Sequence, residues 1–566
     1  MGTPTAGDIV AALTYAPLRG WAGQTISFSI PRAGSNWTDY PQRGAGWSEY
    51  YGNEPFKPDY GVLSSAQADV FRQAVATWQQ FMAVRLVETD DVASPGQIRV
   101  AFTGIGHEIG GYAFVPPLMG QAAQPMDGDI WLDATFKPRS LVPGYDPAAG
   151  EWPIPVLLHE LGHALGLQHS YEGAVRLLGE YEDPRYTIMS QAFIVGGGDV
   201  VPRFAVSAGG SALTIDSTTL AVNQPGIFDI LALQSIYGAN PDTAAGDTTY
   251  AWAEDEAFWL SLYDAGGSDT IDLSRHLRAS AIDLTPGHFS SIGIYSAEQQ
   301  TADWIARFPS FAGQITQMMD AQAASKRLYT GHDNVGIAFN TVIENVHAGS
   351  GDDTVTGNAA SNALNGGPGS DRLFGGDGAD TVTDPSGSNY LRGDEGADSI
   401  VGGSGFDDIN GNMGNDTCVS GGGDDWVVGG RDNDSLVGSA GQNLVYGNLG
   451  NDTCEGGDGN DIVRGGQDND VIFGGAGDDY VSGDKGADTV TGGAGADIFH
   501  TFGDAGLDRV LDFNLAQGDR VQVDPGTQYS VSQVGADTVI DMTGGGQMVL
   551  VGVQISTLTT GWILGA

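Results

Sequence analysis

The chain has 566 residues and a formal net charge of −47, from 71 acidic and 24 basic side chains. This length predicts two or more domains that each bury a core, and the charge argues against nucleic acid and anionic membranes as partners while suiting a protein that gathers cations. Glycine accounts for 87 residues, so part of the chain must adopt an architecture that requires glycine.

No apolar run reaches the length of a transmembrane helix. The first residues have neither a basic region nor an apolar region, so we expect no amino-terminal signal peptide. In chain order, we expect a strand over residues 24–30, a helix that Ser64 or Ser65 caps and that carries Trp78, and short strands over 84–87, 98–102, 112–115 and 129–132. Helix and strands followed by a further helix is an α+β order.

The segment 159–169 reads H-E-x-x-H-x-x-G-x-x-H. His159 and His163 are four residues apart, so on a helix they share one face and can hold one metal ion. Gly166 can adopt a positive φ and end the helix, after which His169 supplies a third nitrogen. Three ligands leave tetrahedral zinc an open position for water, and Glu160 is placed as the general base. The alternative is a surface helix with two solvated histidines, and the added glycine and third histidine favour the zinc site.

Met189 lies in an Ile-Met-Ser step about twenty residues after the third histidine, which reads as the Met-turn beneath a zinc ion. A methionine in an apolar segment is otherwise core filler. With the long zinc motif, this turn resembles the metzincin metalloproteases, specifically the secreted serralysin type. Residues 228–240 resemble the helix that closes the serralysin catalytic domain, and residues 263–272 resemble the opening of the second domain.

Two positions depart from that resemblance. Gln191 stands where serralysins carry a tyrosine near the zinc, and Ser170 stands where they carry proline, as in matrixins. We therefore assign no tyrosine ligand; Tyr186, on the other side of the turn, is a weak candidate for that role. Gln191 either donates a hydrogen bond to an oxyanion or contacts substrate, or it is a spacer. The resemblance also implies that a substrate peptide lies extended beside an edge strand near residues 128–132.

From residue 348 to residue 500, seventeen nonamers follow G-G-x-G-x-D-x-U-x without a break in register. This pattern resembles the calcium-binding parallel β-roll repeat of RTX proteins. The eighth position is always apolar, and the sixth is Asn at 362, 389 and 443. Its aspartates, which we expect to complete oxygen cages for Ca²⁺, are Asp353, Asp371, Asp380, Asp398, Asp407, Asp416, Asp425, Asp434, Asp452, Asp461, Asp470, Asp479, Asp488 and Asp497.

The alternative for this region is an acidic, glycine-rich disordered linker, and the invariant apolar position argues against it. The array holds 27 acids and 5 bases, a net charge of −22, so folding should require calcium. Cys418 and Cys454 both occupy the eighth position, four repeats apart. With two repeats per coil they lie roughly 9–10 Å apart, beyond the reach of a disulfide.

The predicted organisation is an α+β metzincin catalytic domain over residues 1–240, a lead-in over 241–347 with a helical insertion at about 299–326, an all-β parallel β-roll over 348–500, and capping strands with a secretion-signal region over 501–566. The resemblance implies a monomeric, secreted zinc endopeptidase, stabilised by several calcium ions, that acts on protein substrates and leaves the cell through type I secretion machinery, without nucleic acid or a membrane span.

The alternative function is an RTX surface or adhesion protein, associated with the cell surface, whose protease domain is weak or vestigial. Gln191 supports this alternative. The complete set of His159, Glu160, His163 and His169 opposes it, because a decaying site should lose its general base early.

Overall fold

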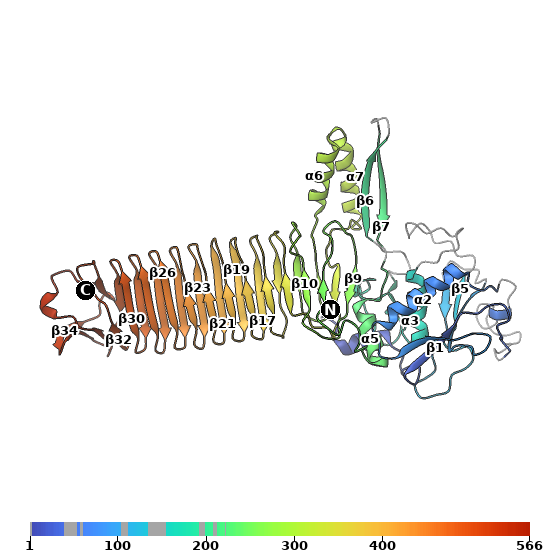
Figure 1. The fold of residues 1–566 in the computed structure, drawn as a ribbon, viewed down its shortest axis with the longest axis horizontal. Coiled ribbons are helices and arrows are strands. Elements are labelled where there is room, and N and C mark those ends of the chain that lie inside the picture. Colours follow the sequence, from blue (N-terminus) through green and yellow to red (C-terminus); the bar gives the residue numbers. More distant parts are fainter. Residues whose placement is uncertain are drawn as a thin grey trace.

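The computed structural model describes residues 3–38, 54–56, 60–103, 111–133, 154–191, 199–207, 212–220 and 222–565. A compact amino-terminal domain is followed by a junction and a long roll (Figure 1). The expected fold class, an α+β domain and then an all-β parallel roll with capping strands, is confirmed. Among the described helices, none is long and apolar enough to cross a membrane.

The amino-terminal domain packs helices against one five-stranded sheet. Its helices are α1 (Ala6–Leu13), α2 (Ser65–Gln79), α3 (Ile154–Leu165) and α5 (Ile227–Tyr237), and its strands are β1 (Thr25–Ser29), β2 (Arg85–Glu88), β3 (Ile98–Thr103), β4 (Gly111–Ala113) and β5 (Ile130–Asp133). Ser64 caps α2 through the backbone N–H of Gln67, as predicted. Trp78 is fully buried and donates from its indole to Leu158 O at 3.1 Å, which fixes α2 against α3.

The sheet order is β2-β1-β3-β5-β4, and β4 alone runs antiparallel. The strand predicted near residues 128–132 is β5, which pairs with β3 on one side and β4 on the other. The prediction that it forms the edge beside the substrate is therefore wrong, because β4 covers it. Among the described strands, β4 is the edge strand on this side of the sheet.

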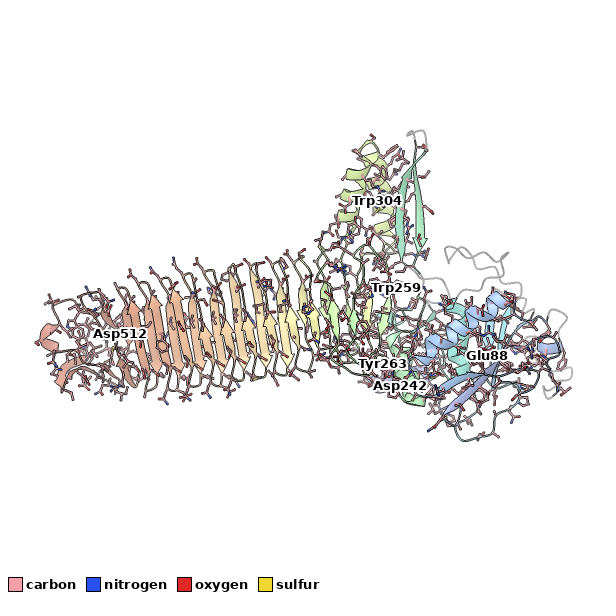
Figure 2. The ribbon with its side chains drawn as sticks, in the orientation of Figure 1. Glu88, Asp242, Trp259, Tyr263, Trp304 and Asp512 are labelled. Atoms are coloured by element: carbon pink, nitrogen blue, oxygen red, sulfur yellow. The ribbon has the colours of Figure 1, made fainter. Side chains whose placement is uncertain are left out.

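The junction contains short strands and a projecting unit. The short strands are β8 (Thr249–Tyr250), β9 (Leu260–Leu262), β10 (Thr270–Asp272), β11 (Ala281–Asp283), β12 (Phe289–Ser290), β13 (Val335–Ile337) and β14 (Asn345–His347). The projecting unit combines the hairpin β6 (Val200–Val206) and β7 (Leu213–Thr219) with α6 (Ala297–Arg307) and α7 (Ala312–Ala324). Its core joins Phe204, Ile315 and Met319, and Trp304 lies in it 5.1 Å from Phe204 (Figure 2). The two helices lie in the segment predicted to be helical.

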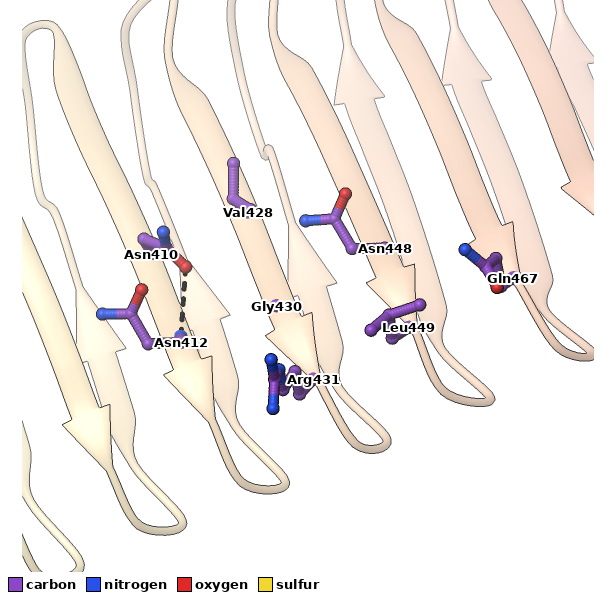
Figure 3. Close-up of a pocket in the computed structure, with 8 residues that line it drawn as sticks. All are labelled: Asn410, Asn412, Val428, Gly430, Arg431, Asn448, Leu449 and Gln467. Atoms are coloured by element: carbon purple, nitrogen blue, oxygen red, sulfur yellow. Dashed lines mark hydrogen bonds between the residues drawn. The ribbon is translucent and has the colours of Figure 1, made fainter.

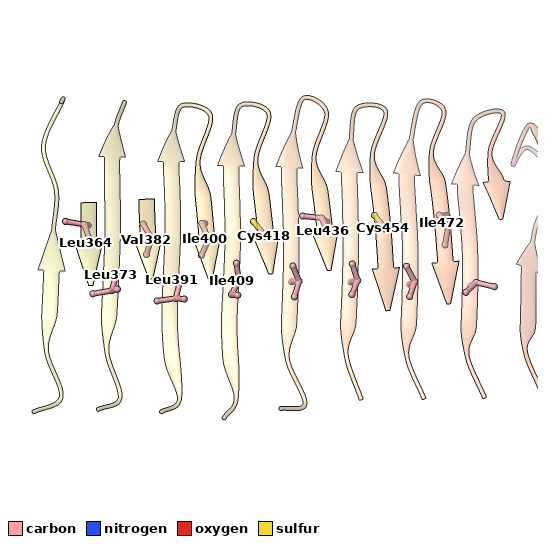
Figure 4. Close-up of a cluster of buried hydrophobic side chains, with 14 of the residues drawn as sticks. Leu364, Leu373, Val382, Leu391, Ile400, Ile409, Cys418, Leu436, Cys454 and Ile472 are labelled. Carbon is pink, nitrogen blue, oxygen red and sulfur yellow. The ribbon is translucent and has the colours of Figure 1, made fainter. Parts of the chain in front are cut away.

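The roll consists of two parallel sheets that share one core (Figure 4). One sheet contains β16 (Ala363–Asn365), β18 (Thr381–Thr383), β20 (Ser399–Val401), β22 (Thr417–Val419), β24 (Ser435–Val437), β26 (Thr453–Asp458), β28 (Val471–Ala476) and β30 (Thr489–Ala494). The other contains β15 (Thr354–Thr356), β17 (Arg372–Asp377), β19 (Asn389–Glu395), β21 (Asp407–Met413), β23 (Trp426–Arg431), β25 (Leu444–Leu449), β27 (Ile462–Gln467), β29 (Tyr480–Lys485) and β31 (Ile498–Thr501).

Residues eighteen apart stack in register, as Leu373 does on Leu391, so one coil spans two nonamers. The eighth-position side chains of both sheets form the continuous core. Cys418 faces Leu436, which faces Cys454, so the two cysteines are two coils apart, buried and free, as predicted.

A cap closes the far end of the roll. Strands β32 (Leu507–Val510) and β33 (Arg520–Val523) continue the two sheets. The antiparallel strands β34 (Tyr529–Val534), β35 (Asp537–Met542) and β36 (Gln547–Leu550) then terminate one sheet, and β37 (Ile563–Leu564) terminates the other. Trp562 packs 6.3 Å from Phe513 over the last coil.

The stacking of coils predicts which glycines are indispensable. Gly396 has a φ of +145°, and an added Cβ would overlap the carbonyl oxygen of Gly378 in the preceding coil, whereas a Cβ at Gly422 meets nothing within 4 Å. We expect Gly396→Ala to lower the unfolding temperature of the calcium-loaded roll, since strain alone costs about 1–3 kcal/mol, and Gly422→Ala to leave it nearly unchanged. Thermal melts followed by circular dichroism measure this, and equal shifts for the two variants would contradict the stacking argument.

Candidate metal sites

Helix α3 and the loop after it bring three histidines together. His159 and His163 lie one turn apart on α3. Gly166 follows with a φ of +109°, and an added Cβ would lie 2.7 Å from Arg19 O, so only glycine fits where the chain turns. The loop then carries His169 back over the same face, with Leu167 N donating to Gly162 O at 2.9 Å.

The imidazole nitrogens converge as tetrahedral zinc requires. His163 Nε2 lies 3.2 Å from His169 Nε2, which lies 3.3 Å from His159 Nε2. The three ligand atoms are all within 4.8 Å of one another. Tetrahedral zinc with Zn–N distances of about 2.0–2.1 Å places its ligand nitrogens about 3.3 Å apart. The residues present therefore fit a zinc ion.

The opposite ring nitrogens fix the tautomer. His159 Nδ1 lies 2.8 Å from Ile188 O, and His163 Nδ1 lies 2.9 Å from Leu167 O. A carbonyl accepts, so each Nδ1 carries the proton and each Nε2 keeps a lone pair for the metal. His169 Nδ1 lies 3.1 Å from Glu172 Oε1. Burial lowers the pKa of His159 to about 4, which keeps this imidazole neutral at physiological pH.

Glu160 is buried next to the edge strand. Burial raises the pKa of its carboxyl to about 8. Its Oε2 has no hydrogen-bond partner among the described residues. A Cβ at Gly111 of β4 would lie 3.3 Å from Glu160 Cγ, so the missing side chain lets the strand approach the carboxylate closely. A buried, unpaired carboxyl beside three convergent imidazoles can accept a proton from bound water.

Met189 is fully buried beneath α3, where a Cβ at Gly162 would lie 3.1 Å from its sulfur. The turn is held by Asp229 of α5, which the sequence reasoning missed. Thr187 Oγ1 donates to Asp229 Oδ1 at 2.5 Å, and Ile188 N donates to Asp229 Oδ2 at 2.8 Å. Asp229 thus positions Ile188, the residue whose carbonyl oxygen orients His159. Its signal in the sequence is a carboxylate at the third position of a helix, where it also accepts from Gly226 N at 2.9 Å.

The two departures from the serralysin pattern meet at Glu182. Ser170 Oγ donates to Glu182 Oε1, and Gln191 N donates to Glu182 Oε2 at 3.0 Å. Ser170 N also donates to Met189 O at 3.2 Å, a bond that proline could not form. These contacts tie the third-histidine loop to the exit of the Met-turn. The Gln191 side chain is exposed, and its role toward an oxyanion stays a prediction.

Two tyrosines near the site have distinct surroundings. The ring of Tyr186 packs 4.9 Å from Phe228 and 4.8 Å from Phe289, in an aromatic cluster at the junction. The ring of Tyr171 stacks on His169 with centroids 4.9 Å apart and an interplanar angle of 10°. Tyr171 therefore braces the third ligand, a contact that the sequence reasoning did not anticipate.

The sixth-position residues of the nonamers form two ladders of hydrogen bonds along the roll. Asp353 N donates to Asp371 Oδ1 at 2.7 Å, and Asp380 N donates to Asp398 Oδ1 at 2.8 Å, each to the residue eighteen further on. The second carboxylate oxygen is buried without a hydrogen-bond partner in the described chain at thirteen sixth-position aspartates: Asp371, Asp380, Asp398, Asp407, Asp416, Asp425, Asp434, Asp452, Asp461, Asp470, Asp479, Asp488 and Asp497.

Glycines place carbonyl oxygens beside these carboxylates. A Cβ at Gly375 would meet both Asp380 Oδ2 and the carbonyl oxygen of Gly393. Carboxylate and carbonyl oxygens around a space kept free by glycine are the ligands that Ca²⁺ prefers. The residues present therefore fit calcium in the way that the repeat predicts.

The ladders extend beyond the predicted array. Asp269 N donates to Glu344 Oε2 at 2.7 Å before it, and Asp497 N donates to Asp519 Oδ1 at 3.2 Å after it. Asp508, beside Asp488, has a buried Oδ1 without a hydrogen-bond partner among the described residues. Residues 264–272 and 503–511 each fit the spacing of one nonamer. Extra residues separate each of these segments from the array, so the uninterrupted nine-residue spacing does not include them.

The amino-terminal domain thus has the fold and ligand geometry of metzincin metallopeptidases, and the carboxyl-terminal half is an RTX β-roll. Family models support both statements: a matrixin model matches residues 54–188, a peptidase M10 serralysin C-terminal model matches 228–307, and an RTX calcium-binding nonapeptide repeat model matches segments between 347 and 508. The matrixin match implies zinc, and the RTX match implies calcium.

Proteins similar in sequence to this chain are also metalloproteases. Metalloprotease AprA of Pseudomonas entomophila is 27% identical over 57% of this chain and 63% of its own length. Metallopeptidase AprA of Pseudomonas marginalis is 26% identical over 60% and 67%. Serralysin of Photorhabdus laumondii is 27% identical over 54% and 56%. The chain thus spans a little over half to two thirds of these relatives, and the resemblance to serralysin-type metalloproteases with RTX repeats is confirmed.

The Met-turn contacts predict a role for Asp229 in zinc affinity. Asn in its place offers one acceptor where a carboxylate offers two, so Ile188 should lose its fixed position. We expect Asp229→Asn to weaken zinc binding by about 10–100-fold, measured by competition with a chromogenic chelator. The control is Asp242→Asn, at an exposed residue (Figure 2). Equal zinc affinity of wild type and Asp229→Asn would refute the role.

The buried carboxylates predict that, in the absence of calcium, the roll is folded only at acidic pH. Burial raises the pKa of Asp470 to about 8 and the pKa values of Asp407 and Asp434 to about 7. Each of these carboxyls has a higher pKa in the folded state than in the unfolded state, so protonation stabilises the fold. Its contribution to the free energy of unfolding is complete below the unfolded pKa near 4 and is lost as the pH rises through about 6–8. Excess chelator should therefore abolish the β-sheet circular dichroism signal at pH 8 but not at pH 5. A signal unchanged by chelator at pH 8 would contradict calcium-coupled folding.

Proposed function

We propose that this protein is a zinc-dependent endopeptidase that hydrolyses peptide bonds in proteins. The observation that carries the proposal is the convergence of His159, His163 and His169 Nε2 beside the buried, unpaired carboxyl of Glu160. One zinc ion held by the three nitrogens would polarise the scissile carbonyl and lower the pKa of its bound water.

Glu160 is the general base and then the general acid. Its carboxylate takes the proton from the attacking water and delivers it to the leaving amine. Burial raises the pKa of this carboxyl, which makes its carboxylate a stronger base toward the attacking water. Asp229 holds Ile188, whose carbonyl oxygen orients the His159 ring, and the ring of Tyr171 stacks on His169.

The edge strand β4 is the proposed substrate platform. Among the described strands of the sheet it pairs only with β5, and Gly111 brings it against Glu160. An extended peptide can add to this edge through backbone hydrogen bonds, which confers affinity with little demand on sequence. The scissile bond would then lie across the zinc site.

On this proposal, residues 1–240 form the catalytic domain, 241–347 connect it to the roll, 348–500 hold several structural calcium ions and 501–566 form the cap. The likeness to serralysins supports secretion through a type I system and extracellular action as a monomer. The Gln191 side chain is proposed to contact the oxyanion or substrate. The alternative, an RTX adhesion protein with a vestigial protease domain, rests on the absence of a tyrosine at this position.

Casein hydrolysis tests the activity. Glu160→Ala removes the general base, so we expect a loss of at least about 10²–10⁴-fold with zinc content retained. The control is Glu88→Gln on β2, the strand at the opposite edge of the sheet. Equal activity of wild type and Glu160→Ala, or no activity in the zinc-loaded wild type, would overturn the proposal, and the second result would favour the adhesion protein.

A further inference from the structure

The roll has two outer faces built from the same repeat, and large side chains are concentrated on one of them. The seventh and ninth residues of each nonamer flank the buried eighth and point outward. On strands β16 to β30 of the first sheet, which form the plain face, these positions hold mainly Thr, Ser and Val. On strands β17 to β31 of the second sheet, which form the aromatic face, they include Arg372, Phe374, Tyr390, Arg392, Trp426, Tyr446, Arg464, Tyr480 and His500.

The calcium-binding repeat does not explain this difference. It specifies glycine, the sixth-position carboxylate and the apolar eighth position equally on both sheets, and it leaves the seventh and ninth positions free. The plain face therefore serves as an internal control. All five basic residues between 348 and 500 lie in strands of the aromatic face: Arg372, Arg392, Arg431, Arg464 and Lys485.

The charges of the aromatic face are balanced locally. Arg392 pairs with Asp408 at 2.9 Å, and Arg464 pairs with Asp484 at 2.8 Å. The Arg392 guanidinium also lies 3.5 Å from the centre of the Tyr390 ring. Its strands hold five bases and five acids outside the sixth position, the acids being Asp377, Asp394, Glu395, Asp408 and Asp484. Within these strand bounds the charges cancel, and acidic residues such as Asp424, Asp432 and Asp468 lie just beyond them, which disfavours a polyanion as the ligand.

A shallow groove of about 420 Å³ crosses this face (Figure 3). Its lining includes the side-chain amides of Asn410, Asn412, Asn448 and Gln467, together with Arg431. Amides both donate and accept hydrogen bonds, and guanidinium donates in a planar fork. Trp426, half-exposed at 50%, stands at the same face 5.7 Å from Phe406.

We propose that the aromatic face binds a neutral polysaccharide chain lying along the axis of the roll. Sugar rings present C–H groups that pack on the negative faces of aromatic rings, and their hydroxyls match planar amide and guanidinium groups. Outward positions recur at every coil, about 4.8 Å apart, and aromatic rings stand at several of these levels along the axis, at Phe374, Tyr390, Trp426, Tyr446 and Tyr480, so a polymer can meet more than one ring. A protein partner would need a contiguous apolar centre, which the alternation with amides and arginines interrupts.

The test is affinity electrophoresis of the calcium-loaded full-length protein in native gels containing laminarin, xylan, hydroxyethylcellulose or soluble starch. Alginate and casein serve as the polyanion and protein arms. We expect at least one neutral polysaccharide to retard the wild type, and Trp426→Ala with Tyr446→Ala to weaken this binding by about tenfold. Phe473→Ala, which removes an aromatic ring from the plain face, should bind as the wild type does.

Circular dichroism with calcium checks that each variant folds, and Asn448→Ala with Gln467→Ala is the substitute if the aromatic variant does not. Retardation by none of the four neutral polysaccharides overturns the proposal. So does retardation by alginate alone, retardation by casein that the Trp426→Ala with Tyr446→Ala variant weakens, or an equal loss in Phe473→Ala. Casein cleavage by all variants is expected to be unchanged, so failure here is separable from failure of the proposed peptidase activity.

Discussion

Two ladders of buried carboxylates run through the roll, and the rest of the carboxyl-terminal half depends on neutralising them. One oxygen of each sixth-position carboxylate accepts a backbone N–H from the neighbouring coil, which spaces the coils and sets their register. At thirteen of these aspartates the other oxygen is buried without a hydrogen-bond partner among the described residues. Like charges about one coil apart in a partly desolvated interior repel one another, and a thin single-file core cannot offset that repulsion. Cations bound between the coils would neutralise these carboxylates and so favour the folded state.

The junction connects that folding to the zinc site. Arg185 lies just before the Met-turn and pairs with Asp333 of the lead-in at 3.5 Å. Tyr186 packs on Phe289, also of the lead-in. The hairpin that follows the Met-turn is tied to the lead-in as well, since Tyr329 N donates to Val200 O at 3.0 Å. The back of the Met-turn therefore rests on residues whose own position depends on the first coils of the roll.

Local patterns in the sequence predicted much of this molecule. The spacing of His159, His163 and His169, the cap at Ser64 and the nine-residue repeat each encode structure over a few residues, and all three are found. What the sequence did not predict depends on which distant segments pair. Three features are examples: β4 is the edge strand, Asp229 accepts hydrogen bonds from the Met-turn, and the hairpin packs on α6 and α7. The place of Asp508 and Asp519 in the ladders was not predicted, because short insertions before them interrupt the nine-residue spacing in the sequence.

The antiparallel strands β34 to β36 and the final strand β37 have a consequence for the state of the protein in solution. A parallel solenoid that simply stopped would expose two rows of unpaired backbone N–H and C=O groups, on which a second molecule could continue the same ladder. In one sheet β35 runs against the direction of the roll, and the other sheet ends on the two-residue strand β37 with Trp562 across the last coil, so neither sheet ends in a long parallel pair of strands. The cap thus opposes end-to-end polymerisation and keeps a self-complementary repeat from growing into a fibre.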